Sequence, residues 1–142
     1  MLRHCLLADR GHLRLEGEEA VPFLQNLVSN DVARAGAERA VYATLLTPQG
    51  RFLFDFLVVG DGSALVLDAE APRLADLQKR LTLYRMRSKV TIGNKTGQWV
   101  TAVLWGDGAA AALGLGEEAG AARAVGDAIA FVDPRLAALG VR

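Results

Sequence analysis

The residue that most invites a chemical role is Asp55, a single acid inside the apolar run Arg51–Val59. Side chains alternate between the two faces of a strand, so Asp55 shares a face with Leu53 and Leu57 while three phenylalanines share the other. A buried carboxylate without a partner is costly. Asp55 is therefore expected either to form a structural ion pair or to hydrogen-bond a polar ligand, and the sequence leaves both open.

A second candidate is a local excess of positive charge around Tyr84. Its members are Lys79, Arg80, Arg85, Arg87 and Lys89. The ordinary interpretation is a solvated helix face followed by a strand edge. The alternative is an anchor for an anionic ligand group, because arginine matches a carboxylate with two parallel hydrogen bonds.

The remaining reactive residue types do not suggest a catalytic or metal centre. His4, Cys5 and His12 are the only soft metal ligands, whereas a zinc site needs about four ligands. A nucleophile needs a positioned base, and neither histidine has a recognisable partner, so these residues are expected to lie at strand ends. The stretch Gly106–Ala111 fits the dinucleotide pattern G-x-G-x-x-A. Asp107 would place a negative charge beside the phosphates, which favours a surface turn.

Composition limits the class of protein. The chain has 142 residues, of which 51% are hydrophobic, with 16 basic and 16 acidic side chains. That length suits one domain, and a net charge of zero gives no reason to expect a nucleic-acid or membrane-surface partner. A single cysteine fits a reducing compartment, and no apolar run approaches the ~18 residues of a membrane span. With no secretory signal visible, the sequence predicts a cytoplasmic protein.

The elements that must position Asp55 begin with a hairpin. Two apolar runs flank Thr47–Gly50, where proline and glycine supply turn geometry. Cys5–Ala8 and His12–Leu15 are expected to pair as antiparallel strands around a turn at Asp9–Gly11. Further predicted elements are strands at 64–67, 88–92, 99–105 and 128–132, helices beginning near Gly17 and Pro72, and one short helix between 106 and 120. Hairpin-length connections predominate, which predicts an α+β fold with a largely antiparallel sheet and helices on one face.

Three segments carry a resemblance to a known family: Gly17–Val32, Tyr42–Phe56 and Leu83–Ile92. In this order they resemble the YgfZ family of folate-binding proteins, which is related to the T protein (aminomethyltransferase) of the glycine cleavage system. The resemblance implies a sheet-rich fold around a cavity that holds tetrahydrofolate. It also implies a role in assembling or maintaining iron–sulfur proteins, with the assembly machinery or its client proteins as partners.

The same resemblance assigns folate-binding residues. Asp55 matches the folate-contacting aspartate of the T proteins, although the acid that precedes it there is Phe54 here. Tyr42 matches a tyrosine before the turn, and Asp68 matches an asparagine at the end of the next strand. The expected folate-binding set is Tyr42, Asp55, Asp68, Tyr84, Arg85 and Arg87, with the arginines facing the glutamate carboxylates.

One departure from the family concerns length. YgfZ proteins carry the motif K-G-C-[YF]-x-G-Q-E in their second half, and these 142 residues do not contain it. Residues 1–142 are therefore expected to be a single folate-binding-like domain, the N-terminal portion of a longer protein.

The resulting functional prediction is a tetrahydrofolate-binding accessory protein for iron–sulfur cluster assembly or repair, not catalytic in this form. Two alternatives remain open. The first is an aminomethyl transferase of the T-protein type. The second is a structural module that pairs with its missing half, and that self-associates through the apolar face which this half would cover.

Overall fold

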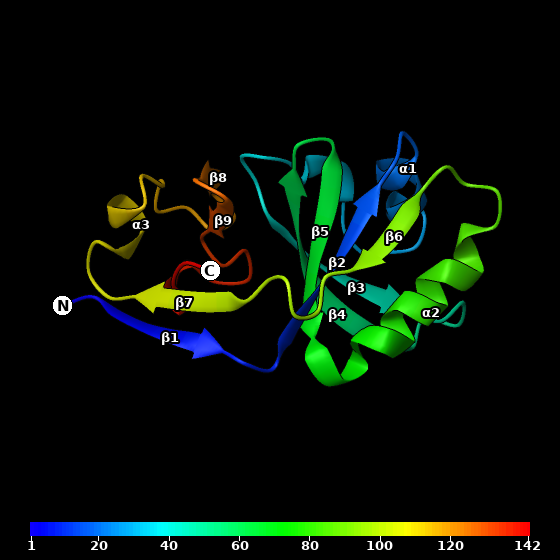
Figure 1. Ribbon diagram of the computed structural model, residues 1–142, viewed down its shortest axis with the longest axis horizontal. Coiled ribbons are helices and arrows are strands. Elements are labelled where there is room, and N and C mark those ends of the chain that lie inside the picture. Colours follow the sequence, from blue (N-terminus) through cyan, green and yellow to red (C-terminus); the bar gives the residue numbers. More distant parts are fainter.

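The computed structural model describes residues 1–142 and is built around one five-stranded antiparallel sheet (Figure 1). The strand order is β3-β4-β5-β2-β6. These strands are β2 (Arg10–Glu16), β3 (Val41–Leu46), β4 (Phe52–Asp61), β5 (Ala64–Glu70) and β6 (Thr91–Asn94).

Two helices pack on one face of this sheet, namely α1 (Ala20–Gln25) and α2 (Leu74–Arg85). The main hydrophobic core lies between them and the strands, because Leu77 and Leu81 of α2 are fully buried against residues such as Leu13. The α+β fold class with helices on one face is confirmed. None of the helices is long and apolar enough to cross a membrane.

The predicted hairpin is present as β3 and β4, which pair antiparallel across the turn at Thr47–Gly50. Phe54 and Phe56 are buried in the helix-side core. Asp55 lies between them in the strand, so its side chain points to the opposite face of the sheet. The predicted alternation of Asp55 with the phenylalanines is therefore confirmed. The face of the sheet that carries Asp55 is the one without helices, and is called the helix-free face.

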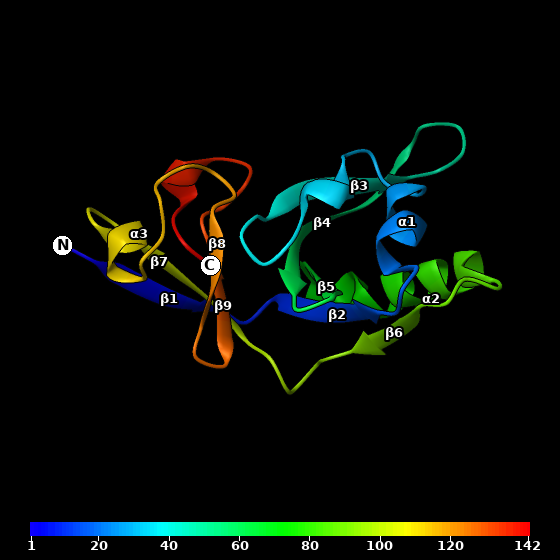
Figure 2. The same cartoon turned by 90° about the horizontal axis from the view of Figure 1, so that it is seen from above.

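A smaller part of the chain lies beside the sheet (Figures 1 and 2). In it β1 (Arg3–Leu7) pairs with β7 (Thr101–Trp105), and β8 (Ala122–Val125) pairs with β9 (Ala128–Phe131). A four-residue helix, α3 (Ala109–Ala112), follows β7. Leu57, Val59 and Val66 of the central sheet form a second core with residues of β8 and β9. The smaller part thus covers a portion of the helix-free face.

The predicted hairpin of the first two strands is wrong. β1 pairs with β7, whereas β2 pairs with β5 and β6. The chain passes from one sheet to the other around Asp9, whose carbonyl accepts a hydrogen bond from the Ala71 amide 2.7 Å away. The turn chemistry at this point changes the direction of the chain without pairing the strands that flank it.

Other boundaries also differ from the predicted ones. α1 begins at Ala20 and ends at Gln25, so it is shorter than its apolar pattern suggests. β6 begins at Thr91, because a tight turn follows α2, closed by a 2.8 Å hydrogen bond from the Ser88 amide to the Arg85 carbonyl. β8 lies just after the alanine- and glycine-rich stretch 106–120, at a place where no strand was expected.

Candidate functional site

Asp55 and Tyr42 form a hydrogen-bonded pair on the helix-free face. The Tyr42 hydroxyl donates to Asp55 Oδ2 over 3.0 Å, across the β3–β4 ladder, and it is the only side-chain partner of this carboxylate. Burial raises the pKa of Tyr42, and the hydrogen bond and charge of Asp55 raise it further, with Arg135 opposing them. Asp55 is thus held by a neutral phenol and forms no ion pair, which leaves its second oxygen able to accept from a ligand.

Asp68 is the centre of a separate buried network. Its side chain lies inside β5 and only 4% of the residue is exposed, so it is not an ordinary strand-end residue. Arg10 Nε donates to its Oδ1 over 2.6 Å, and the Thr101 hydroxyl donates to its Oδ2 over 3.3 Å. Burial alone would raise the pKa of Asp68, but the neighbouring His12 and Arg10 outweigh it and hold this pKa below its usual value.

A second buried carboxylate, Asp133, extends this network. It is fully buried and accepts hydrogen bonds from Arg135 Nε at 2.9 Å and from Arg142 Nε at 3.1 Å. Burial opposes its ionisation, but the hydrogen bonds from Arg135 and the charge of Arg142 lower its pKa. Arg142 Nη1 in turn lies 3.8 Å from Asp68 Oδ2. Arg142 therefore joins the last segment of the chain to the central sheet.

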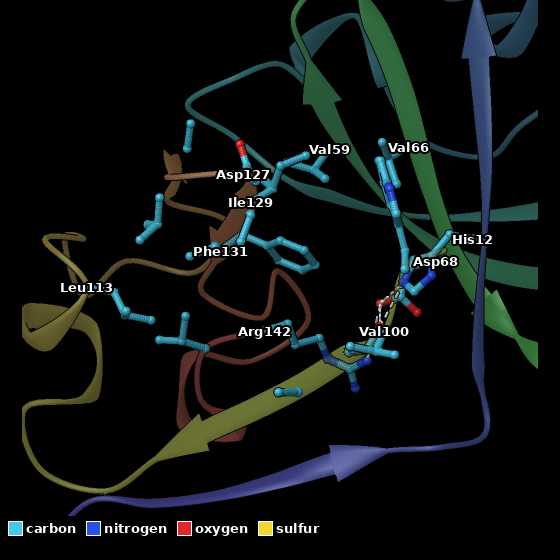
Figure 3. Close-up of a pocket in the computed structure, with 18 of the residues that line it drawn as sticks. His12, Val59, Val66, Asp68, Val100, Leu113, Asp127, Ile129, Phe131 and Arg142 are labelled. Atoms are coloured by element: carbon cyan, nitrogen blue, oxygen red, sulfur yellow. Dashed lines mark hydrogen bonds and ion pairs between the residues drawn. The ribbon is translucent and has the colours of Figure 1, made fainter. Parts of the chain in front are cut away.

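Between the central sheet and the smaller part lies a cavity of about 740 Å³, called the inter-sheet cavity here (Figure 3). Its walls are mostly apolar and include Val59, Val66, Ile129, Phe131 and Trp99. Its polar end is formed by His12, Asp68, Thr101 and Arg142. A cavity of this size, with apolar walls and a few convergent polar groups, is typical of a small-molecule site.

The expected folate-binding residues are not brought together. Tyr42 and Asp55 contact each other, and only Asp68 lines the inter-sheet cavity. Tyr84 belongs to α2, on the other face of the sheet, and lines a smaller pocket of about 310 Å³ beside the β3–β4 turn.

The two arginines of that set follow Tyr84 around the end of α2. Arg85 Nη1 donates to the Val90 carbonyl over 3.2 Å, and Arg87 is exposed. The helices pack on the face of the sheet opposite Asp55, so Tyr84, Arg85 and Arg87 lie on the other side of the sheet from this carboxylate.

Sequence reasoning missed His12 as a site residue. It was expected at a strand end, but it lies within β2 and is 6% exposed. The available signal was the alternation of His12 and Arg14 with Leu13 and Leu15, which places the two polar residues on the helix-free face. Thr101 gave no such signal, because its partners His12 and Asp68 lie far away in the sequence. Asp133 and Arg142 contact each other and are close in the sequence, but nothing in their segment indicates that it lies beside Asp68.

Comparison with known proteins adds a relationship that covers nearly the whole chain. No family model matches the sequence. The human mitochondrial iron–sulfur cluster assembly factor IBA57 is 39% identical over 150 residues, which cover 96% of this chain and 41% of the relative. The mouse protein of the same name is 34% identical, over 69% of this chain and 31% of its own length. The IBA57 homologue of Mycosarcoma maydis is 27% identical, over 94% of this chain and 34% of its own length.

The fold has a counterpart among solved structures. Aminomethyltransferase T of the glycine cleavage system of Bartonella henselae superposes with a TM-score of 0.76, over 93% of this chain and 38% of that protein. The sequence identity is 17%, so this likeness concerns the fold alone. The chain thus spans about two fifths of the proteins that it matches in sequence and in structure.

The predicted cytoplasmic location is wrong by the same comparison. All four matching assembly factors are named as mitochondrial proteins. A lone cysteine indicates a reducing environment, and a balanced net charge indicates that no strongly charged partner is needed. They do not distinguish one reducing compartment from another.

Proposed function

We propose that this chain, which belongs to the YgfZ family related to the T protein of the glycine cleavage system, is a tetrahydrofolate-binding accessory protein in iron–sulfur cluster assembly. The relatives are named as iron–sulfur cluster assembly factors, which supports a role in that process. The likeness to the aminomethyltransferase fold supports folate as the ligand. Assembly proteins or their clients are the partners that follow from this role. We also propose that residues 1–142 form one folate-binding-like domain.

The observation that carries the proposal is the state of Asp55. Its carboxylate is half-buried, is oriented by the Tyr42 hydroxyl, and forms no ion pair, although the charge of Arg135 acts on it from farther away. Such an acceptor suits the N–H groups of a reduced pterin or of the adjoining N10 region, because an ionised acceptor strengthens a hydrogen bond. Bound tetrahydrofolate would supply one-carbon chemistry, while Tyr42 and Asp55 bind and orient it.

The other expected contacts take different roles in this proposal. Both oxygens of Asp68 already have partners in Arg10 and Thr101, so Asp68 shapes the neighbouring cavity and is a weaker candidate for direct contact. Tyr84, Arg85 and Arg87 lie on the helix face and are left out of the folate site.

Calorimetry with tetrahydrofolate tests the assignment of Asp55. Asp55→Asn keeps the shape of the side chain and removes its charge, so the affinity should fall about tenfold or more. Asp76→Asn, the same change on the exposed side of α2, is the matched control and should bind like the wild type. Equal affinity in Asp55→Asn and the wild type would refute the role of Asp55.

An aminomethyl transferase has less support from this chain. The position that is acidic in the T proteins is Phe54, a residue that is 7% exposed and packs in the helix-side core. No second acid can therefore reach the ligand from this position. Turnover of an aminomethyl donor by the protein would contradict the accessory role.

A further inference from the structure

The strand β1 is an open edge of its sheet. It pairs with β7 on one side, and neither a strand nor an isolated bridge lies on its other side. Figure 1 shows β1 as the outermost strand of the smaller part of the chain. Its first four residues are exposed, and Leu6 is 68% exposed. An open edge offers backbone hydrogen-bonding groups to a further strand.

The hydrogen bonds of β7 show which backbone groups of β1 face outward. The Leu104 amide donates to the Val141 carbonyl, and the Val141 amide donates to the Leu104 carbonyl, both over 2.8 Å. A residue in an antiparallel ladder directs both of its backbone groups to the same neighbouring strand. Leu104 therefore points away from β1, and His4, which lies opposite Leu104, points away from β7. Leu6 follows by alternation, and its carbonyl accepts from the Cys5 thiol at 3.2 Å.

β1 lacks most of the features that protect the edge of a sheet. Charged side chains, proline and bulges are the usual means by which an edge strand avoids pairing with another chain. β1 contains no proline and no lysine, and its register with β7 is regular. Arg3 is its only residue with a permanent charge. The edge is therefore suited to accept an extended strand through backbone hydrogen bonds.

A second copy of β1 fits this edge. Outward-facing residues of one strand must lie opposite outward-facing residues of the other, because each such pair exchanges two hydrogen bonds. One antiparallel register meets this condition and pairs all five residues of the strand. In this register His4 lies opposite Leu6 of the second copy, and Cys5 lies opposite Cys5 on a two-fold axis. Arg3 then lies alongside the end of the other β1, which Asp9 follows closely.

Charge complementarity favours a second copy as the occupant of this edge. Arg3 and Asp9 are both exposed, and neither forms an ion pair within the chain. Their positions in one extended strand would be about 20 Å apart, which is too far for them to pair with each other in one chain. The two-fold arrangement brings Arg3 of each copy to Asp9 of the other and places no two like charges opposite each other.

We propose that β1 is a dimerisation edge, at which two copies of the chain pair their β1 strands antiparallel about Cys5 and join their two β1–β7 sheets. The contact is small, and interfaces below about 1,200 Å² are typical of transient complexes. The expected dimer is therefore weak, with a Kd of roughly 100 µM. The proposal does not depend on the folate assignment, because the pair of Tyr42 and Asp55 lies on the central sheet and takes no part in this contact.

Sedimentation equilibrium of the full chain under reducing conditions tests the dimer and its charge pairs. The wild type should be mostly monomeric at about 10 µM and mostly dimeric at about 500 µM. Arg3→Asp and Asp9→Arg each replace two attractions by two repulsions, so each should raise the Kd about tenfold or more. The double variant should restore the wild-type Kd. Because the two residues are too far apart to pair within one chain, this restoration reports a contact between copies.

Two further variants test the backbone pairing. Leu6→Pro removes an amide that faces outward, and proline is tolerated at such a position of an edge strand. It should therefore abolish the dimer and leave the thermal unfolding of the monomer unchanged. Leu6→Ala, the matched control, keeps the amide and should retain the dimer.

Disulfide trapping tests the register. Directly opposed residues that do not exchange hydrogen bonds have Cα atoms about 4.5 Å apart, which suits a disulfide. Copper phenanthroline should therefore link the two copies through Cys5. Leu6→Cys in a Cys5→Ser background places the two Cα atoms about 8 Å apart in the same register, so this variant should give little cross-linked dimer.

The outcomes decide between a second copy and other occupants of the edge. A wild type that stays monomeric at 500 µM overturns the proposal and leaves the edge to an extended segment of another protein. A dimer that withstands Leu6→Pro, or a double charge variant that does not recover the wild-type Kd, also overturns it. Each of these results leaves the assignment of Asp55 to the folate site as it stands.

Discussion

Replacing Asp133 by asparagine should destabilise the protein by about 3 kcal/mol at pH 7. The carboxylate is fully buried and accepts from the Arg135 amide at 3.0 Å, from Arg135 Nη2 at 2.5 Å and from Arg142 Nε at 3.1 Å. An asparagine amide keeps one acceptor but turns an N–H₂ group toward a guanidinium. Breaking a buried charge pair costs about 3–5 kcal/mol. We expect the lower end of this range, because the Arg135 side chain is 35% exposed and water can solvate its charge once the pair is broken.

Urea denaturation of both proteins checks this value. Asp107→Asn, the same change at an exposed turn, is the control and should leave the free energy of unfolding within about 0.5 kcal/mol of the wild type. A loss of 3 kcal/mol corresponds to a fall of roughly 10 °C in Tm for a chain of this size.

The pH dependence provides a second check. The folded-state pKa of Asp133 is lowered from 3.8, so its contribution is present above that pH and is lost as the pH falls through the folded-state value. The difference between the wild type and Asp133→Asn should therefore shrink on acidification below pH 4. An Asp133→Asn protein as stable as the wild type at pH 7, or a difference that does not shrink, would refute the reasoning.

Three further changes test other features. Tyr42→Phe removes the hydrogen bond to Asp55 and should cost about 1 kcal/mol at pH 7; because the pKa of Tyr42 is raised, the difference in stability should decline as the pH rises above about 10. Gly60→Ala places a Cβ 2.4 Å from the Gly36 carbonyl carbon, which should lower the free energy of unfolding by about 3 kcal/mol. Met86 has φ 46° and is 85% exposed, so Met86→Gly should raise Tm by relieving about 1 kcal/mol of strain; a lower Tm would contradict this.

The features that the sequence predicts well are local. The turn at Thr47–Gly50, the alternation that isolates Asp55 and the apolar stripe of α2 each depend on neighbouring residues. Strand partners are different. β1 and β2 are adjacent in the sequence, yet β1 pairs with β7 nearly one hundred residues later. An apolar alternation shows that a strand has a buried face and contains no information on which strand lies beside it.

The inter-sheet cavity is beyond local reasoning for the same reason. Its polar end combines His12, Asp68, Thr101 and Arg142, which come from four separate parts of the chain. Each is ordinary in its own segment. The arginines near Tyr84 show the converse, because their clustering in the sequence suggests a ligand anchor, whereas α2 carries them to the opposite face from Asp55.

The arrangement of the sheet explains why both candidate regions share one face. Once helices and core leucines occupy one side, every polar residue that alternates with them must point to the other side, as Asp55 does beside Phe54 and as His12 does beside Leu13. Left open, that face would offer its polar groups to water. The smaller part of the chain covers it through Arg142, which contacts Asp133 and approaches Asp68. The desolvation that leaves His12 Nδ1 unpaired is thus a consequence of the same contacts that close the cavity.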